Sequence, residues 1–301
     1  MKIPFERFRV YKIGALVALT LALLAASRPG ARADGNNWMA GIDGGRSLTE
    51  MSIPGAHDAG ARFEPLKGTT KCQNLTISEL LNVGVRFLDI RCCNTGKEFS
   101  IYHGPVFQRL TFAQALTAVS DFLKTNPTET VIMSIKEENS NTGSTFKTVF
   151  NSYVAKDPKL WYLKSSLPTL NSVRSKIVLF RRFTGSQGID ASNWPDNTSF
   201  TSGKLDVEDY YHVPNSSAKW EAVVKHLDAA KAGSKQSLYI TFASGYVAGA
   251  SGLPNITAVS DDVNQKLSGY FQNGGKARYG VVLIDFVDLA ICRQIATSEG
   301  G

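Results

Sequence analysis

Short apolar segments rich in β-branched residues alternate with longer amphipathic segments along most of this sequence. The short segments are typical of buried strands, and the longer ones have the periodicity of helices. Strands are expected at Met51–Pro54, Val85–Arg91, Phe99–His103, Thr130–Lys136, Ile177–Arg182, Lys204–Glu208, Leu238–Phe242 and Gly280–Asp285. Helices are expected at Thr76–Asn82, Thr111–Lys124, Ser144–Lys156, Ser216–Ala232, Val259–Gly274 and Leu289–Thr297.

This alternation predicts a parallel barrel. A barrel of eight strands and eight helices has about 250 residues, and residues 34–301 provide that length without a Pro- or Ser-rich linker or a repeat. The connection from Cys93 to Glu98 is too short for a helix, so we expect an irregular (β/α)8 barrel of the TIM type in a single α/β domain. A doubly wound open sheet is the alternative, but no glycine-rich phosphate loop follows any expected strand.

Residues 1–33 have the three parts of a secretory signal peptide. The basic segment Lys2–Lys12 precedes an apolar run over Ile13–Ala26, and Ala31–Ala33 offers a small-residue cleavage site. The apolar run is shorter than the about 20 residues that a membrane span needs. We therefore expect a secreted protein whose mature part is residues 34–301.

Removal of this segment also removes most of the positive charge. The whole chain has a formal charge of +7, and residues 1–33 contain six Lys or Arg against one Glu. The remaining chain keeps a charge of only about +2, so no strongly basic surface is indicated and we expect no nucleic-acid partner.

The four cysteines of the mature part are an even number in an oxidising compartment, which favours disulfides. They are Cys72, Cys92, Cys93 and Cys292. Their spacing matches no zinc motif. A bridge between the neighbours Cys92 and Cys93 would be strained, which leaves two complete pairings open.

Polar side chains recur where the expected strands end. In a parallel barrel the carboxyl ends of the strands meet on one face, and functional residues gather there. The polar residues at or just after these ends are His57, Asp58, Asp89, Arg91, His103, Lys136, Arg182, Asp209, Tyr211 and Asp285. We therefore expect a polar site on this face.

Two of the four histidines lie in unusual surroundings. His57 lies in the small-residue segment Ser52–Gly60, and His103 lies in a Tyr-His-Gly-Pro turn. Two histidines beside a phosphate can carry out linked proton transfers, one accepting a proton from the nucleophile and one donating to the leaving oxygen. Nearby cations stabilise charge on phosphoryl oxygens, and Asp58 and Asp285 can support charged imidazoles. The pattern favours phosphodiester cleavage.

Four motifs in order resemble one enzyme family. They are Ser52–Gly60, Val85–Arg91, Tyr102–Gly104 and Val131–Lys136. Together they are similar to the catalytic X region of phosphatidylinositol-specific phospholipase C, with the order and spacing of the secreted, single-domain bacterial members. The similarity extends over nearly the whole mature chain, although its second half matches through short motifs only. The resemblance implies cleavage of phosphatidylinositol, free or in glycosylated anchors, to diacylglycerol and inositol 1,2-cyclic phosphate.

The resemblance also implies catalytic roles. His57 matches the general base that deprotonates the inositol 2-hydroxyl, and His103 matches the general acid that protonates the diacylglycerol oxygen. Asp285 corresponds to the carboxylate partner of the base, and Asp58 corresponds to that of the acid. The inositol-contacting set is matched by Lys136, Arg182, Asp209 and Tyr211, with Arg181 competing for the place of Arg182.

Arg91 indicates whether the expected site uses a metal. By resemblance it corresponds to the cation that stabilises the phosphate, with Asp89 beside it. Relatives that use Ca²⁺ have an acidic residue at this position, because a hard cation needs oxygen ligands, and they tend to have Asn in the place of Asp58. We therefore expect catalysis with no metal and no other cofactor.

Three other functions compete with this one. A glycerophosphodiesterase on a similar barrel needs acidic metal ligands near the first histidine, which Asp58, Ala59 and Gly60 supply poorly. A non-catalytic lipid- or glycan-binding barrel would be expected to lose one of the two histidines. A serine hydrolase would need a Gly-x-Ser-x-Gly turn, which the sequence lacks.

The expected partner is phosphatidylinositol in a membrane, contacted transiently by a monomer. The loop Gly245–Pro254 follows the seventh expected strand and contains Tyr246, Val247 and Leu253 as its large apolar residues. Aromatic side chains often lie at the level of the lipid headgroups. We therefore expect this loop at the membrane-facing rim of the site.

Overall fold

A curved sheet of mostly parallel strands forms the centre of the protein, in a computed structural model that describes residue 1 and residues 36–298. The strands follow the order β6-β7-β5-β2-β1-β14-β11-β10-β9. Eight of them run parallel: β6 and seven others that lie between residues 52 and 284. These seven are β1 (Ser52–Ala56), β2 (Phe87–Asn94), β5 (Val131–Glu137), β7 (Ile177–Arg182), β10 (Leu205–Glu208), β11 (Leu238–Phe242) and β14 (Gly280–Ile284).

The remaining strands lie at the edges of this sheet, except for β12 and β13, which form a separate two-stranded sheet. They are β3 (Phe99–His103), β4 (Val106–Thr111), β6 (Trp161–Tyr162), β8 (Ile189–Asp190), β9 (Phe200–Ser202), β12 (Val247–Ala248) and β13 (Pro254–Asn255). Within residues 36–298 no strand pairing joins β7 to β10. The barrel is therefore irregular and open on that side.

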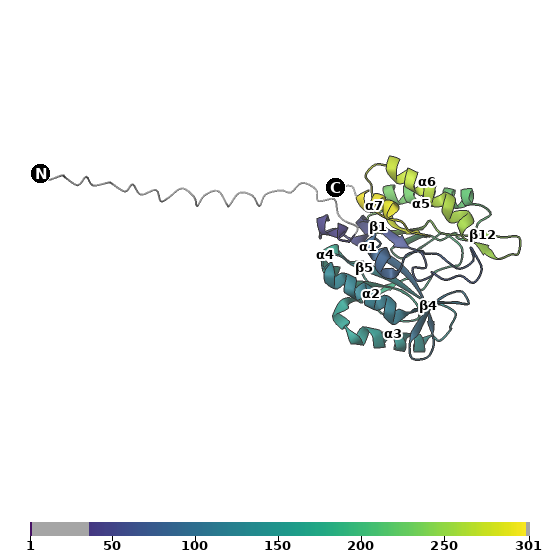
Figure 1. Ribbon diagram of the computed structural model, residues 1–301, viewed down its shortest axis with the longest axis horizontal. Helices are drawn as coiled ribbons and strands as arrows, with labels where there is room; N and C mark the ends of the chain where they lie inside the picture. Colours follow the sequence, from purple (N-terminus) through teal and green to yellow (C-terminus); the bar gives the residue numbers. More distant parts are fainter. Residues whose placement is uncertain (2–35, 299–301) are drawn as a thin grey trace. The chain divides into compact units, whose positions relative to one another are not determined.

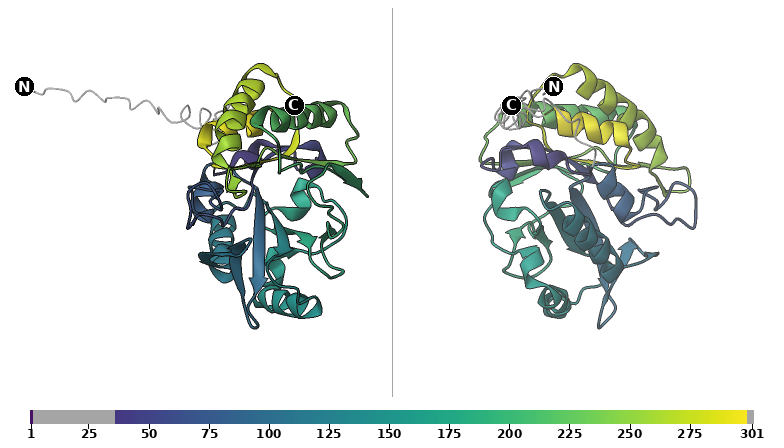
Figure 2. Two further views of the ribbon diagram at one scale, coloured as in Figure 1. Left: turned by 90° about the vertical axis from the view of Figure 1, so that its right-hand side faces the viewer. Right: turned by 60° about the vertical axis from the view of Figure 1, so that its left-hand side comes forward.

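Helices cover the outside of the sheet. In Figures 1 and 2, α5, α6 and α7 pack together on one side, α2 and α3 lie on the opposite side, and the strands lie between them. The α-helices are α1 (Ile77–Asn82), α2 (Phe112–Thr125), α3 (Ser144–Lys156), α4 (Leu170–Val173), α5 (Ser216–Ala232), α6 (Thr257–Asn273) and α7 (Leu289–Thr297). The 3-10 helices are η1 (Trp38–Gly41), η2 (Leu48–Glu50) and η3 (Pro158–Leu160). The predicted cap Thr111 accepts a hydrogen bond from the backbone of Gln114 and starts α2.

Successive residues of a strand enter two different cores. Val282 and Ile284 of β14 pack with helix side chains in an outer core between sheet and helices. Val281 and Leu283 belong to an inner core that also holds Trp38, which precedes β1. Because side chains alternate along a strand, fully apolar strands such as β14 can fill both cores at once. The polar residues are left for the strand ends.

The predicted irregular barrel is confirmed, but one predicted strand has a different place in it. Phe99–His103 was expected as the third barrel strand, whereas β3 pairs antiparallel with the last residues of β2 and with β4. A parallel pair needs a long crossover, while a short connection permits only an antiparallel pair. The connection over residues 95–98 is short, so β3 turns back beside β2 instead of joining the barrel.

The prediction of disulfides is wrong, because all four cysteines are free. Cys92 and Cys93 are neighbours on β2, and their side chains point to opposite faces of the sheet. Cys72 packs with Ala61 and Ile256 beside the site, whereas Cys292 lies on α7. The four thiols therefore lie in different surroundings, and burial raises the pKa of each one.

The signal peptide predicted over residues 1–33 lies outside residues 36–298 and stays a prediction. Residues 36–298 belong to one compact unit. Within them, no helix combines the length and the apolar composition that a membrane crossing requires.

Candidate active site

A cavity of about 570 Å³ opens at the carboxyl ends of the parallel strands. Eight of the ten residues predicted for the site line it, and they are His57, Arg91, His103, Lys136, Arg182, Asp209, Tyr211 and Asp285. Asp58 and Asp89 are fully buried beside it. The structure therefore brings the predicted residues together, although they come from seven different strands or strand ends.

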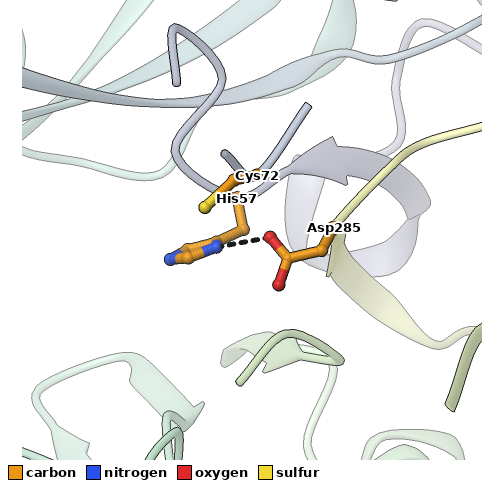
Figure 3. Close-up of side chains that lie close together, drawn as sticks. All are labelled: His57, Cys72 and Asp285. Atoms are coloured by element: carbon orange, nitrogen blue, oxygen red, sulfur yellow. Dashed lines mark hydrogen bonds and ion pairs between the residues drawn. The ribbon is translucent and has the colours of Figure 1, made fainter. Parts of the chain in front are cut away.

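The imidazole of His57, just after β1, is held on both sides. Its Nδ1 lies 2.8 Å from Oδ1 of Asp285, which follows β14 (Figure 3). Its Nε2 lies 2.9 Å from Nη2 of Arg91. A guanidinium can only donate, so Nε2 accepts from Arg91 and Nδ1 donates to Asp285. Burial disfavours the charged imidazole, but the Asp285 carboxylate outweighs it and raises the pKa of His57 above 6.5.

The second histidine reaches the cavity from the hairpin of β3 and β4. Nδ1 of His103 donates to the carbonyl oxygen of Thr70 at 2.9 Å. Oδ2 of Asp58, the predicted partner of His103, lies 3.5 Å from the same nitrogen, and Sγ of Cys72 lies 3.6 Å from it. The carboxylate is thus an ionic neighbour of His103 without a direct hydrogen bond.

Asp58 is an unusual buried carboxylate. Its backbone has φ 38°, a left-handed conformation that is uncommon for residues other than glycine. Both of its carboxylate oxygens are buried without a hydrogen-bond partner. Burial raises the pKa of Asp58, against the opposing effect of Arg91 and His103. Strained backbone and unpartnered polar atoms of this kind concentrate at functional sites.

Arg91, on β2, is surrounded by carboxylates. Its Nε lies 3.3 Å from Asp89 and 3.5 Å from Asp58, and its Nη1 lies 3.7 Å from Glu138. Burial disfavours the charged form of Asp89, but Arg91 and Arg182 outweigh it and lower the Asp89 pKa to about 2. The same surroundings raise the pKa of Arg91, so the guanidinium is a fixed positive charge at the cavity wall.

Arg182 and Arg181 end β7 on opposite faces, and this separates the two candidates that the sequence left open. Arg182 lines the cavity, and its guanidinium lies 3.9 Å from the ring centre of Trp194. Arg181 instead pairs with Asp190 at 2.9 Å and donates to the carbonyl of Phe183. Arg182 is therefore the arginine that faces the cavity.

The remaining wall is polar and aromatic. Trp194 donates from Nε1 to Asp209 at 2.8 Å, and Tyr211 donates to Asp196 at 2.6 Å. Burial and the Asp196 contact raise the pKa of Tyr211, so its hydroxyl stays protonated. This wall offers hydroxyl, carboxylate and aromatic surfaces that suit a polyhydroxylated ring.

Glu138 was not predicted, although its position carried a signal. It follows Lys136 by two residues, a spacing that places both side chains on one face of a strand. Glu138 pairs with Lys136 at 2.8 Å and accepts from the backbone N–H of Gly104 at 2.8 Å. Burial opposes its charge, but Arg91 and Lys136 lower the Glu138 pKa to about 2. This carboxylate ties the hairpin that holds His103 to β5.

Gln73 is another residue that the sequence did not indicate. Its buried Nε2 donates at 2.8 Å to the carbonyl oxygens of both His57 and Ile284, and its Oε1 accepts from Val287 at 3.2 Å. The side chain therefore joins the ends of β1 and β14, which hold His57 and Asp285. A single glutamine in a loop has no local sequence pattern that would reveal this role.

Within residues 36–298, two groups of buried or partly buried side chains have atoms suitable for ligating a metal. One is His57, Cys72 and Asp285 (Figure 3), and the other is Asp58, Cys72 and His103. Both share the thiol of Cys72. The contacts of His57, with Asp285 and Arg91, are those of a neutral imidazole that can accept a proton.

The fold and the site define the protein as a barrel enzyme of the acid–base type. Two imidazoles, each beside a buried carboxylate, face a cavity with fixed cations at the carboxyl ends of parallel strands. Such a combination suits the cleavage of a phosphodiester, because it provides proton transfer and charge stabilisation together.

Comparison with known proteins gives the family. A family model for phosphatidylinositol-specific phospholipase C, X domain, matches residues 51–183. A 1-phosphatidylinositol phosphodiesterase of Staphylococcus aureus (strain Newman) is 32% identical over 279 residues, covering 83% of this chain and 88% of that protein. One from Listeria monocytogenes is 28% identical over 199 residues, covering 62% of each. The chain belongs to the phosphatidylinositol-specific phospholipase C family.

Solved structures agree with this assignment. A phosphatidylinositol-specific phospholipase C from S. aureus has a TM-score of 0.78 and 31% identity, covering 89% of this chain and 98% of that one. The corresponding enzyme from L. monocytogenes has a TM-score of 0.73 at 22% identity, covering 89% and 100% of the two chains. The second likeness shows the shared fold alone.

Proposed function

We propose that this protein cleaves phosphatidylinositol to diacylglycerol and inositol 1,2-cyclic phosphate without a metal. The observation that carries the proposal is the pair of imidazoles, His57 and His103, that line one cavity with Arg91. The family assignment supplies the substrate class, since the relatives are named for phosphatidylinositol.

His57 acts as the general base. Its Nδ1–H is bound to Asp285, so Nε2 is the nitrogen available to take the proton of the inositol 2-hydroxyl. The hydroxyl oxygen then attacks phosphorus. In the ligand-free site Nε2 accepts from Arg91, and a bound phosphate, with its negative charge, competes for that guanidinium and frees the base.

His103 acts as the general acid. It donates a proton to the diacylglycerol oxygen as the bond between that oxygen and phosphorus breaks. Asp58 stabilises the positive imidazolium from 3.5 Å. Arg91, which Asp89 holds at 3.3 Å, stabilises the negative charge on the phosphoryl oxygens. Because Arg91 occupies the wall with a permanent charge, Ca²⁺ is not needed there.

The inositol ring is assigned to the wall formed by Lys136, Arg182, Asp209 and Tyr211. These side chains offer two cations, one carboxylate and one protonated hydroxyl toward the cavity. Hydroxyl-rich rings bind through such mixed donors and acceptors, and phosphatidylcholine lacks the ring hydroxyls that would satisfy them.

The remaining parts of the proposal concern place and partner. Residues 1–33 are assigned as a secretory signal, and the mature protein acts as a secreted monomer that touches a membrane transiently. The loop Gly245–Pro254 supports the membrane contact, because Gly245, Tyr246 and Pro254 line the cavity and Leu253 is 45% exposed.

A mixed-micelle assay tests the function. Phosphatidylinositol, phosphatidylcholine and a phosphorylated inositol lipid are supplied in turn, with and without chelator, and diacylglycerol is measured. We expect release from phosphatidylinositol in both conditions and little from phosphatidylcholine. Equal release from all three lipids would refute inositol specificity, and loss of activity with chelator would refute the metal-independent mechanism.

A further inference from the structure

The thiol of Cys72 lies between the two histidine–carboxylate pairs. Cys72 is a free cysteine with no exposed surface. Its Sγ belongs to both groups of potential ligand atoms, one with His57 and Asp285 and one with Asp58 and His103. Figure 3 shows the thiol beside the His57 ring and the Asp285 carboxylate. The proton-transfer mechanism has no task for this sulfur.

Two distances in the group with His103 suit a tetrahedral ion, and all three ligand atoms of the group lie within 4.8 Å of one another. Nδ1 of His103 lies 3.5 Å from Oδ2 of Asp58 and 3.6 Å from Sγ of Cys72. An ion with bonds of about 2.0–2.3 Å keeps tetrahedral ligand atoms about 3.3–3.8 Å apart. The other group does not fit, because Nδ1 of His57 and Oδ1 of Asp285 are only 2.8 Å apart in a hydrogen bond.

The carboxylate of this group is available. Both oxygens of Asp58 are buried and lack a hydrogen-bond partner, and the side chain has no exposed surface. An unpartnered carboxylate beside a thiol and an imidazole combines the ligand types that bind Zn²⁺ and Cd²⁺. The positive charge of Arg91, 3.5 Å from Asp58, opposes a cation, and a thiolate formed on binding offsets it.

We propose that Cys72, His103 and Asp58 form an inhibitory site for a thiophilic divalent cation such as Zn²⁺ or Cd²⁺. The ion replaces the thiol proton, which is released to water. It binds Nδ1 of His103 as the Nδ1 proton moves to Nε2, and it displaces the hydrogen bond between Nδ1 and the Thr70 carbonyl. Water supplies the fourth ligand. This ion is an inhibitor and has no part in the catalytic cycle.

Inhibition follows from the protonation of His103. With the ion on Nδ1, the imidazole is neutral and holds its remaining proton on Nε2 much more firmly than an imidazolium does. His103 can then no longer act as a general acid. This consequence rests on the proposed function of His103, whereas binding of the ion does not.

Binding is tested first, without reference to activity. The purified protein is titrated with Cd²⁺, and thiolate-to-cadmium charge-transfer absorption in the ultraviolet is recorded. We expect one equivalent to bind to the wild type and to Cys93→Ser, a matched control for a second buried thiol. Cys72→Ser should lose more than about 100-fold in affinity, since even supporting residues outside the ligand set contribute 10–100-fold. Absorption that persists in Cys72→Ser, or is absent from the wild type, would overturn the proposal.

Activity is tested second, with Zn²⁺ in the micelle assay. Wild type and Cys93→Ser should be inhibited and recover with chelator, whereas Cys72→Ser should need more than about 100-fold more Zn²⁺. Equal sensitivity of all three would overturn the inhibitory site. If the wild type cleaves no phosphatidylinositol, the proposed function fails while the cadmium titration still decides the site. If Cys72→Ser does not fold, Cys72→Ala and the cobalt absorption spectrum of the wild type provide the same decision.

Discussion

The two imidazoles of the site differ in their hydrogen bonds, and this difference separates their roles. His57 has its Nδ1 fixed by Asp285, while Nδ1 of His103 is fixed by the Thr70 carbonyl. Replacing either one by Ala should lower turnover by about 10²–10⁴-fold, because one proton transfer is lost. A substrate with a good leaving group should partly rescue His103→Ala and not His57→Ala. Equal rescue of both, measured by initial rates, would show that the acid and base are exchanged.

The raised pKa of His57 gives a pH dependence with a definite sign. A base must be neutral to accept a proton, so kcat/KM falls below the pKa of the free enzyme. That limb is expected above pH 6.5, because Asp285 raises the His57 pKa. Asp285→Asn removes the negative charge and should move the limb to lower pH while reducing the plateau rate. Asp288→Asn, an exposed control on the neighbouring segment, should leave the limb in place, and a limb unmoved by Asp285→Asn would contradict the assignment.

Arg91 combines a fixed charge with a planar set of donors. Arg91→Lys keeps the charge but cannot reproduce the paired hydrogen bonds of a guanidinium on phosphate. We expect a loss in kcat of about 10²-fold, the size found when one donor to a developing oxyanion is removed. Activity in excess chelator should be unchanged for the wild type. Arg62→Lys, which changes an exposed arginine, is the control, and near-normal rates for Arg91→Lys would show that charge alone suffices.

Site residues at strand ends could be predicted from the sequence, whereas site residues in loops could not. Lys136 and Arg182 followed from strand ends, and the same alternation would have revealed Glu138. Trp194 could not be predicted, because it lies in an irregular segment with no periodic pattern. Asp58 was predicted as the carboxylate partner of His103, and the structure places its Oδ2 3.5 Å from Nδ1 of His103 without a hydrogen bond.

At the scale of elements, the hairpin of β3 and β4 shows that the bounds of a strand do not predict its pairing partners or its direction. The bounds Phe99–His103 were predicted as the structure has them, but strand direction depends on the length of the preceding connection. By turning back along β2, β3 brings His103 to the cavity at the turn of its hairpin with β4. Pairing partners of a strand are set by tertiary contacts, so the local pattern predicted the strand and not its place.

The segment 70–73 connects the two histidines. Thr70 binds His103 through its carbonyl, and Gln73 binds the ends of β1 and β14. We expect Gln73→Met, of similar volume, to lower the free energy of unfolding by about 1–3 kcal/mol, because it leaves the buried carbonyl of His57 unpaired. The Ile284 carbonyl keeps the hydrogen bond from the backbone N–H of His57. The variant should also lower kcat more than it changes KM, because the distance between His57 and Asp285 is no longer fixed.

Urea unfolding and steady-state kinetics measure these two effects. Gln272→Met, at an exposed position of α6, is the matched control and should change neither quantity. A Gln73→Met protein with normal kcat and reduced stability would limit Gln73 to a structural role. Normal values for both would exclude it as a positioning residue.

At the scale of the whole molecule, two exposed apolar side chains, Leu66 and Leu253, lie in segments next to residues that line the cavity. Within residues 36–298 the exposed large hydrophobic side chains are Leu66, Phe107, Leu253 and Leu289. Leu253 precedes the lining residue Pro254, and Leu66 lies in the segment whose Gly68 carbonyl accepts from Ile256. Phe107 follows the hairpin turn after His103. Of these four residues, the sequence predicted only Leu253 at the membrane-facing rim. The exposure of single apolar residues in separate loops leaves no pattern in the hydropathy of the sequence.

Leu66 and Leu253, the two rim residues, lead to a prediction about membrane binding. The ring of Tyr246 stacks on that of His212, with 4.8 Å between the ring centres, and Tyr246 is only partly exposed. Leu66 and Leu253 are more exposed, so they are better placed to enter a lipid surface. Each fully buried leucine contributes about 1.5–3 kcal/mol, and the double change Leu66→Ser with Leu253→Ser should weaken vesicle binding by about tenfold or more. Hydrolysis of a monomeric, short-chain substrate should not change. Leu289→Ser, at an exposed apolar position on α7, should bind vesicles as the wild type does. Unchanged sedimentation of the double variant with phosphatidylinositol vesicles would exclude this rim as the membrane contact.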